Sequence, residues 1–304
     1  MRISTERVAV RVPATSANLG PGFDALGLAL ALHDDLELEA TTGPVEVTVE
    51  GEGAKDVPTG EEHLVVRALR RGLDHAGAPQ VGVRLHCRNR IPHGRGLGSS
   101  AAATVAGLML ARQLLGDPEA LDDQSVLDLA TEMEGHPDNA APALLGGVVL
   151  SWTDRVGARA VRLQVAPDGI DPVVLLPSAT LATSSARSLL PETVPHADAA
   201  FTAGRAALLV HALATDPALL LPATEDRLHQ DHRAPGMPQS VELVRVLRSE
   251  GYPAVISGAG PSVLVMAGGD GALAPLVRRV VDDPTGWRIA RVGLSSNGAV
   301  PVVP

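Results

Sequence analysis

Residues 91–103 read Ile91-Pro92-His93-Gly94-Arg95-Gly96-Leu97-Gly98-Ser99-Ser100-Ala101-Ala102-Ala103. Three alternating glycines run through two serines into an alanine-rich segment that is typical of a helix. Glycine has no Cβ atom, so successive backbone N–H groups can point toward one centre. The first turn of the following helix adds a partial positive charge of about half a unit. The stretch therefore predicts a loop that holds an anion of nucleotide size.

The common phosphate-binding loops do not match this stretch. A Walker A loop needs Gly-Lys-Ser/Thr, but the stretch has no lysine. The dinucleotide fingerprint needs glycine at its sixth position. When Gly94 is counted as the first position, the sixth is Ser99. The sequence also lacks the His-Arg-Asp and Asp-Phe-Gly triplets of protein kinases, and Ser99 and Ser100 lack the Gly-x-Ser-x-Gly elbow of serine hydrolases. Taken alone, the loop could still be a glycine-rich turn that caps a buried helix.

Composition limits the class of protein. The 304 residues are 45% hydrophobic, which is enough for one large or two moderate domains. The net charge of −10 argues against nucleic acid or an anionic membrane as a partner. The single cysteine, Cys87, is expected to be a small buried apolar residue in a reducing compartment. Residues 1–12 resemble a strand rather than a signal peptide, and no apolar run reaches membrane-spanning length, so we expect a cytoplasmic protein.

Hydrophobic periodicity predicts an α+β protein in two parts, residues 1–160 and 161–304. The boundary is placed where the pattern loosens into short charged and glycine-containing stretches. Helices are expected over residues 62–76, 100–115, 125–134, 197–214 and 239–250. Strands are expected over residues 7–12, 36–40, 45–50, 81–88, 172–176 and 288–294, with two more flanking residues 257–262.

Several polar residues are candidates for a site. Asn18 and Asp24 lie in a glycine-rich connection after the first strand, where a scaffold can present side chains, although ordinary turn chemistry explains them equally well. Glu134 ends a predicted helix and is either a solvated surface residue or, paired with a loop serine, part of an oxygen-ligand set for Mg²⁺. The segment His33-Asp34-Asp35 is interpreted as a polar patch at a strand edge rather than as a metal site.

Two arginines lie in polar surroundings, Arg187 among serines and Arg233 in the segment His229–Pro235. The planar guanidinium group matches a carboxylate with two parallel hydrogen bonds. If the two arginines converge, they would therefore recognise the carboxyl group of an amino acid. Considered singly, each is more typical of a surface charge.

Three separated motifs, 13–24, 92–103 and 257–262, resemble in order and spacing the signature motifs of the GHMP kinase superfamily. The middle motif, Pro-x-x-x-Gly-Leu-Gly-Ser-Ser-Ala-Ala, is highly specific to that superfamily. Within it, the chain resembles the homoserine kinase family in four segments: Thr15–Asp24, Glu134–Asn139, Ala186–Pro191 and His229–Pro235. The resemblance implies an N-terminal domain like domain 2 of ribosomal protein S5, with a left-handed crossover, and a ferredoxin-like C-terminal domain. It further implies an active site between the two domains and a homodimer.

The resemblance also implies a role for each matching residue. The loop would bind the phosphates of ATP, Ser100 and Glu134 would hold Mg²⁺, and Arg187 and Arg233 would grip the carboxylate of L-homoserine. Asn18, Asp24, His136 and Asn139 would surround the amino and hydroxyl ends of that substrate, with Asn139 orienting the hydroxyl for transfer. The loop residues concerned are Pro92, His93, Gly94, Arg95, Gly96, Leu97, Gly98, Ser99, Ser100, Ala101 and Ala102.

Three questions stay open at this stage. Asp24 either accepts the hydroxyl proton or pairs with the ammonium group of the substrate. The acceptor could instead be another small alcohol, such as mevalonate, a sugar or shikimate. The fold could also serve as a nucleotide sensor without catalysis.

Overall fold

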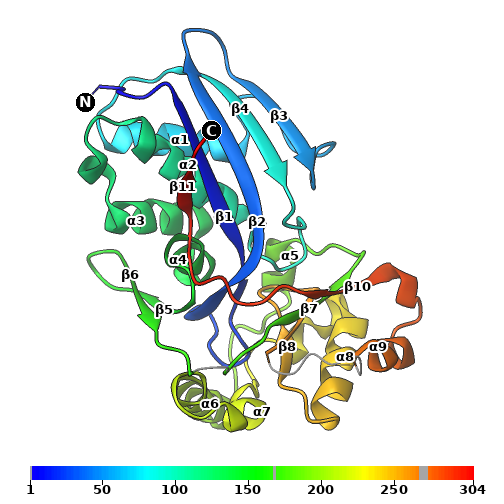
Figure 1. Ribbon diagram of the computed structural model, residues 1–304. Coiled ribbons are helices and arrows are strands. Elements are labelled where there is room, and N and C mark those ends of the chain that lie inside the picture. Colours follow the sequence, from blue (N-terminus) through cyan, green and yellow to red (C-terminus); the bar gives the residue numbers. More distant parts are fainter. Residues whose placement is uncertain (1, 167–168, 267–272) are drawn as a thin grey trace.

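The computed structural model describes residues 2–166, 169–266 and 273–304, which form two β-sheets with helices packed on them (Figure 1). Within these described residues, the first sheet has seven strands. Its central path runs β11-β1-β2-β4-β3, and the hairpin β5–β6 joins it by pairing with β2. The strands are β1 (Arg7–Ala17), β2 (Leu26–Thr41), β3 (Glu46–Gly51), β4 (Gly82–Asn89), β5 (Val148–Thr153), β6 (Ala158–Leu163) and β11 (Val300–Val302).

Four helices, α1 (Leu64–His75), α2 (Ser99–Leu114), α3 (Asp123–Glu134) and α4 (Pro137–Leu145), pack with this sheet. The central one is α2, whose small residues let neighbouring backbones approach closely. A Cβ atom on Gly107 would lie 2.3 Å from the carbonyl oxygen of Val65 in α1, so only glycine permits this packing distance. Because α2 is surrounded by other elements, its predicted apolar pattern extends around most of the helix.

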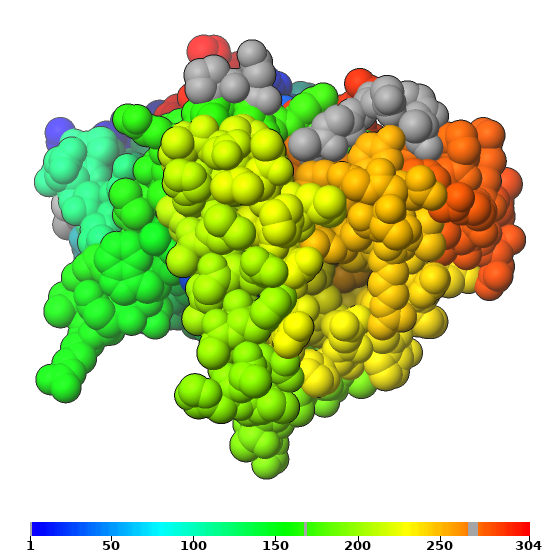
Figure 2. Space-filling model, turned by 90° about the horizontal axis from the view of Figure 1, so that it is seen from below, coloured from blue at the N-terminus to red at the C-terminus, as the bar shows by residue number. Residues whose placement is uncertain are grey.

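The second sheet has the order β10-β7-β9-β8, and all its neighbouring strands are antiparallel. Its strands are β7 (Val173–Pro177), β8 (Ala254–Ile256), β9 (Val263–Val265) and β10 (Trp287–Arg291). With α8 (Pro238–Ser249) and α9 (Leu273–Val280), they follow the strand–helix–strand–strand–helix–strand order of a ferredoxin-like unit. The expected α+β class is confirmed. Figure 2 shows α6 (His196–Ala214) and α7 (Leu220–Ala223), in yellow-green to yellow, beside the gold of α8.

Many elements lie near their expected positions, but several differ, among them β2, which begins at Leu26 rather than at residue 36. Strand β1 continues to Ala17 rather than ending at residue 12. The polar corner at residues 135–139 contains the first turn of α4. This helix was not predicted, because a continuous apolar run follows the corner and shows no helical period. Strand β6 lies in the stretch interpreted as a loosened boundary, and the last strand, β11, returns to pair with β1 in the first sheet. The chain therefore passes from the first sheet to the second between β6 and β7, and β11 lies in the first sheet.

Two simpler expectations have clear outcomes. Cys87 is only 1% exposed in β4, and burial raises the pKa of its thiol to about 12, so it behaves as the expected small apolar residue. Among the described residues, no helix combines the length and apolar character that a membrane span requires.

Candidate active site

The glycine-rich loop connects β4 to α2, and its three alternating glycines all adopt left-handed backbone conformations. The φ angles of Gly94, Gly96 and Gly98 are 63°, 71° and 65°. A Cβ atom on Gly96 would lie 2.1 Å from the carbonyl oxygen of Ser257, and one on Gly98 would lie 1.9 Å from Oγ1 of Thr15. Gly96 and Gly98 are therefore required both for backbone conformation and for close packing, because larger residues would push the neighbouring motifs away.

The start of this loop is fixed by Asp34, one residue of the segment interpreted as a polar patch. Its side chain is 6% exposed, and its Oδ1 accepts hydrogen bonds from the backbone N–H groups of Arg90 and Ile91. Burial raises the pKa of this carboxyl group to about 6, although the two backbone hydrogen bonds oppose the shift. Asp34 thus anchors the loop from the neighbouring strand rather than forming an exposed patch.

The three motifs meet at one place. The Ser257 hydroxyl donates to the carbonyl oxygen of Gly96 at 2.6 Å and lies 2.8 Å from the Ser16 hydroxyl. The Asn18 amide donates to the carbonyl oxygen of Gly258 at 2.9 Å. These bonds join positions up to 241 residues apart in the sequence, so the order and spacing of the motifs reflect a single packed centre.

A cavity of about 590 Å³ opens at this centre. Its lining joins the loop, the start of α4, α5 (Thr183–Ser188) and the third motif. Of the expected loop residues, Gly94, Gly96, Leu97, Gly98, Ser99, Ser100 and Ala101 line the cavity, whereas Pro92, His93, Arg95 and Ala102 lie outside its lining. Asn18, Glu134, His136, Asn139, Arg187 and Arg233 also line it. A smaller cavity of about 250 Å³ adjoins it at Ser99 and Ser100, and His93 lies there.

Glu134 lies beside the first turn of α2, as the sequence prediction required. Its Oε1 accepts hydrogen bonds from the hydroxyl groups of Ser100 and Thr104, both at 2.8 Å. Thr104 was missed by the sequence analysis, although its spacing of four residues from Ser100 puts the two on one helix face. A carboxylate with neighbouring hydroxyl groups is a set of hard oxygen donors of the kind that Mg²⁺ prefers together with substrate phosphates.

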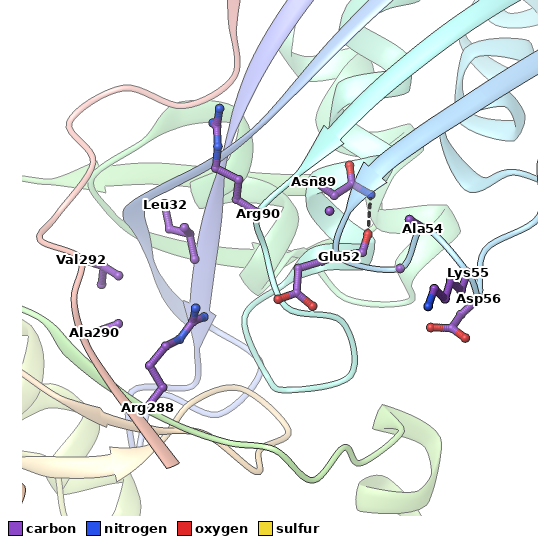
Figure 3. A pocket seen from close by; sticks show the side chains of 12 residues that line it. Leu32, Glu52, Ala54, Lys55, Asp56, Asn89, Arg90, Arg288, Ala290 and Val292 are labelled. Atoms are coloured by element: carbon purple, nitrogen blue, oxygen red, sulfur yellow. Dashed lines mark hydrogen bonds between the residues drawn. The ribbon is translucent and has the colours of Figure 1, made fainter. Parts of the chain in front are cut away.

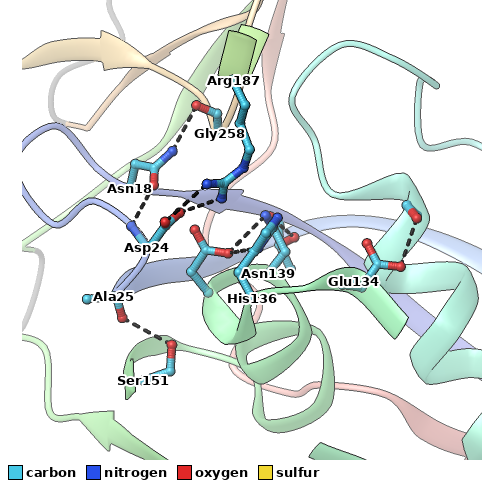
Figure 4. Close-up of polar contacts among 12 residues, drawn as sticks. Asn18, Asp24, Ala25, Glu134, His136, Asn139, Ser151, Arg187 and Gly258 are labelled. Atoms are coloured by element: carbon cyan, nitrogen blue, oxygen red, sulfur yellow. Dashed lines mark hydrogen bonds and ion pairs between the residues drawn. The ribbon is translucent and has the colours of Figure 1, made fainter. Parts of the chain in front are cut away.

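Asn139 and His136 lie at the first turn of α4 (Figure 4). The Thr15 hydroxyl donates to Oδ1 of Asn139 at 2.8 Å, and the Asn139 amide donates to Oδ1 of Asp138 at 3.5 Å, which leaves one amide N–H as a further donor. His136 contacts the buried carboxylate of Asp138 through Nδ1, and this hydrogen bond is the main cause that raises the pKa of His136. Thr15 and Asp138 carry no sequence signal of their own beyond lying inside the motifs.

Asp24 lies outside the lining of this cavity, but it pairs with Arg187, which lines it (Figure 4). The Arg187 guanidinium donates to both carboxylate oxygens of Asp24, at 2.6 and 3.2 Å. Both side chains are 36% exposed, so the pair is open to solvent. The loop that carries Asp24 is unusual, because Asn18, Leu19 and Asp24 all have positive φ angles without being glycine. Such conformations are costly and persist only where surrounding contacts impose them, as at binding sites.

Arg233 is 1% exposed at the back of the cavity. It donates to Gly258 O at 3.2 Å and to Nδ1 of His229 at 3.1 Å, and its Nε finds no partner among the described residues. Because arginine only donates, His229 must accept through Nδ1 and carry its proton on Nε2, which lies 2.7 Å from the carbonyl oxygen of Gly20. Burial lowers the pKa of Arg233. His229, stacked on Phe23, was not singled out by sequence as a positioning residue.

A second, more open groove of about 740 Å³ lies on another part of the molecule (Figure 3). It runs between the ends of β3 and β4 and the edge strand β10, with Arg90 and Arg288 among its polar residues. Its lining shares no residue with that of the cavity at the three motifs. None of the motif residues that line the cavity therefore lies in this groove.

The chain is similar to proteins of one superfamily. The family described as GHMP kinases N terminal domain matches residues 63–147. The homoserine kinase of Streptomyces avermitilis is 54% identical over 293 residues, covering 96% of this chain and 94% of the relative. The homoserine kinase of Clavibacter michiganensis is 52% identical over 295 residues, covering 96% and 93% of the two chains.

Solved structures extend the comparison to the fold. The crystal structure of homoserine kinase from Cytophaga hutchinsonii superposes with a TM-score of 0.86 and 27% identity, covering 98% of each chain. L. major mevalonate kinase, crystallised with R-mevalonate, shares the fold alone, with a TM-score of 0.68 and 15% identity over 96% of each chain. The chain therefore belongs to the homoserine kinase family of the GHMP kinases.

Proposed function

We propose that this protein transfers the γ-phosphate of ATP to the side-chain hydroxyl of L-homoserine and so forms O-phospho-L-homoserine for threonine biosynthesis. One observation carries the proposal. A single cavity has the glycine-rich loop and Glu134 as one part of its lining and the two arginines as another, with Asn139 also lining it. The family membership and the match in sequence to named homoserine kinases support the same reaction.

The loop and Glu134 suit the nucleotide. Backbone N–H groups at the first turn of α2 would bind phosphate oxygens, and the adjoining cavity of about 250 Å³ would take the purine base. Ser100 and Glu134 would hold Mg²⁺, with Thr104 fixing the carboxylate. Mg²⁺, when bound, would neutralise part of the phosphate charge.

The part of the cavity lined by Arg187 and Arg233 suits a zwitterion. The carboxylate of homoserine would bind Arg187 and Arg233, and its ammonium group would bind Asp24 with Asn18 and His136 nearby. This substrate would replace one solvent-open ion pair, Arg187 with Asp24, by two new ones of the same kind. The exchange leaves neither protein charge unpaired, so the electrostatic cost of opening the pair is offset.

The reaction requires an oxygen–phosphorus bond to form at the hydroxyl as the bond to ADP breaks. Phosphoryl transfer needs positioning and charge stabilisation more than covalent help from the protein. The oxygen of Asn139 accepts a hydrogen bond from Thr15 and its amide donates to Asp138, so one amide N–H would orient the hydroxyl oxygen of the substrate. We assign Asp24 to the ammonium group, because its carboxylate is placed to pair with a cation, as it does with Arg187, and the hydroxyl proton passes to phosphate or solvent.

The test is a coupled assay of ADP release. The purified protein is given ATP, Mg²⁺ and one acceptor: L-homoserine, L-serine, L-threonine, mevalonate, shikimate or a hexose. Preferred turnover of L-homoserine is expected, and phosphorus NMR should show the phosphate on the side-chain oxygen. Faster turnover of a non-amino alcohol would replace the substrate assignment, whereas no ADP release with any acceptor would favour a nucleotide sensor.

We also propose, from the family resemblance, that the protein is a cytoplasmic homodimer. The buried thiol of Cys87 suits a reducing compartment. Light scattering on the purified protein should give twice the 31.3 kDa mass of one chain. A mass of one chain at micromolar concentration would contradict the dimer.

A further inference from the structure

The glycine-rich loop lacks a cation that faces the cavity. Its one charged residue, Arg95, lies outside the cavity lining. The Arg95 guanidinium donates to the carbonyl oxygen of Ser178 at 3.2 Å and lies 3.9 Å from Glu52. A triphosphate bound at this loop beside Glu134 would bring several negative charges together. Backbone dipoles supply only about half a unit of positive charge to balance them.

A cation reaches the same cavity from α1. Leu64 and Arg67 both line the cavity, because a spacing of three residues puts them on one helix face. Arg67 is exposed, and its guanidinium forms no ion pair or hydrogen bond with any residue that the structure describes. The other two arginines of α1 are engaged elsewhere: Arg70 binds Glu61 and the carbonyl oxygen of Val81, and Arg71 binds Glu132 at 2.8 Å.

We propose that Arg67 binds the phosphate groups of the nucleotide and takes the place of the lysine that a Walker A loop would supply. The planar guanidinium can donate two parallel hydrogen bonds to phosphate oxygens. Arg187 and Arg233 already have partners, Asp24 for one and Gly258 for the other, and the proposed function assigns both to the acceptor. The inference rests on the nucleotide half of the proposed function and is independent of which alcohol is the acceptor.

The first experiment compares Arg67→Ala with Arg71→Ala as a matched control. The two arginines lie one helical turn apart, both are largely exposed, and only Arg67 lines the cavity. Arg67→Ala should raise the KM for ATP by about tenfold or more, a loss of about 1.4 kcal/mol, while the KM for homoserine stays near the wild-type value. The KM for ATP of Arg67→Lys should fall between those of wild type and Arg67→Ala, because lysine keeps the positive charge but lacks the planar pair of donors. Equal KM values for ATP in the two alanine variants would overturn the proposal.

The second experiment measures binding without an acceptor, so that it does not depend on turnover. Calorimetry with adenosine, AMP, ADP and ATP should show that the affinity ratio of wild type to Arg67→Ala grows with the number of phosphates. Added salt should reduce the ratio for ATP, because an exposed charge pair is screened. An equal loss for adenosine and ATP would place Arg67 at the base instead and refute a phosphate contact.

The two proposals fail separately. If wild-type protein phosphorylates none of the acceptors but the phosphate-dependent binding loss is present, the proposed reaction is wrong and the role of Arg67 stands. If homoserine is phosphorylated and Arg67→Ala binds ATP as tightly as Arg71→Ala, the reaction stands and the role of Arg67 is wrong. The melting temperatures of both variants should match wild type, since neither side chain is buried.

Discussion

Substituting Gly98 by alanine tests whether the loop is shaped by close packing as well as by backbone conformation. Gly98 and Gly94 have nearly the same φ angle, 65° and 63°. Their surroundings differ, because a Cβ atom on Gly98 would lie 1.9 Å from Oγ1 of Thr15 and 2.9 Å from Oδ1 of Asn139. On Gly94 the nearest atom would be 3.4 Å away, in Thr180. Gly94→Ala is therefore a matched control for conformational strain alone.

The expected free-energy costs follow from these distances. A left-handed conformation costs an L-residue about 1 to 2 kcal/mol, which should be the whole loss of unfolding free energy in Gly94→Ala. In Gly98→Ala, Thr15 and Asn139 must also move apart from the new methyl group. That movement adds about 1 kcal/mol for their hydrogen bond and about 1 to 3 kcal/mol for overpacking. Gly98→Ala should therefore lose about 3 kcal/mol or more.

The two variants should also differ in catalysis. If Asn139 orients the acceptor hydroxyl, a displacement of about 1 Å can lower kcat by about a hundredfold in Gly98→Ala. Urea unfolding and ADP-release kinetics measure the two effects. Combining Gly98→Ala with Thr15→Ala removes the crowded hydroxyl and should recover part of the lost stability, a non-additivity of the kind that contacting residues show. Additive losses, or equal losses for Gly94→Ala and Gly98→Ala, would refute the packing argument.

Three further predictions concern the ligands and the loop anchor. Arg187→Ala should raise the KM for homoserine by about tenfold or more and leave the KM for ATP near wild type, because a carboxylate contact is lost; equal increases for both would reject the carboxylate role. Thr104→Val should raise the Mg²⁺ concentration needed for half-maximal rate by about fivefold, since Glu134 loses one donor, and should weaken Mn²⁺ binding measured by EPR, while Thr104→Ser restores both. An unchanged metal dependence in Thr104→Val would count against this positioning role. The pKa of Asp34, raised to about 6 from 3.8, means that the folded protein holds this proton more tightly than the unfolded chain. The stability it contributes is therefore complete below about pH 4 and lost as the pH rises to about 6. Asp34→Asn keeps an oxygen acceptor for the loop and should flatten this part of the pH profile in urea unfolding; an unchanged slope would show that Asp34 is not its source.

Local regularities explain which elements the sequence predicts well. Helices α1, α3 and α6 and strands β3, β4 and β7 begin and end within a few residues of the expected positions, because apolar periodicity and helix-ending residues are local signals. Strand β11 has three residues, too few for any period to be read, and its partner β1 lies almost the whole chain away. Strand β6 lies at an edge of the sheet and carries charged residues, so its sequence pattern resembles that of a loop.

The sequence by itself determined the chemistry that is available: glycines where the backbone turns left-handed, hydroxyl groups at a helix start, one helix-ending glutamate, and two arginines in polar segments. These follow from residue type and short spacing. Only the tertiary structure decided which groups meet. Arg187 pairs with Asp24 across 163 residues of sequence, Thr104 joins Ser100 on Glu134, and Arg67 reaches the cavity that Arg95 does not. Such pairings depend on how packed elements place side chains in space, and packing across long separations leaves no periodic trace in a single sequence.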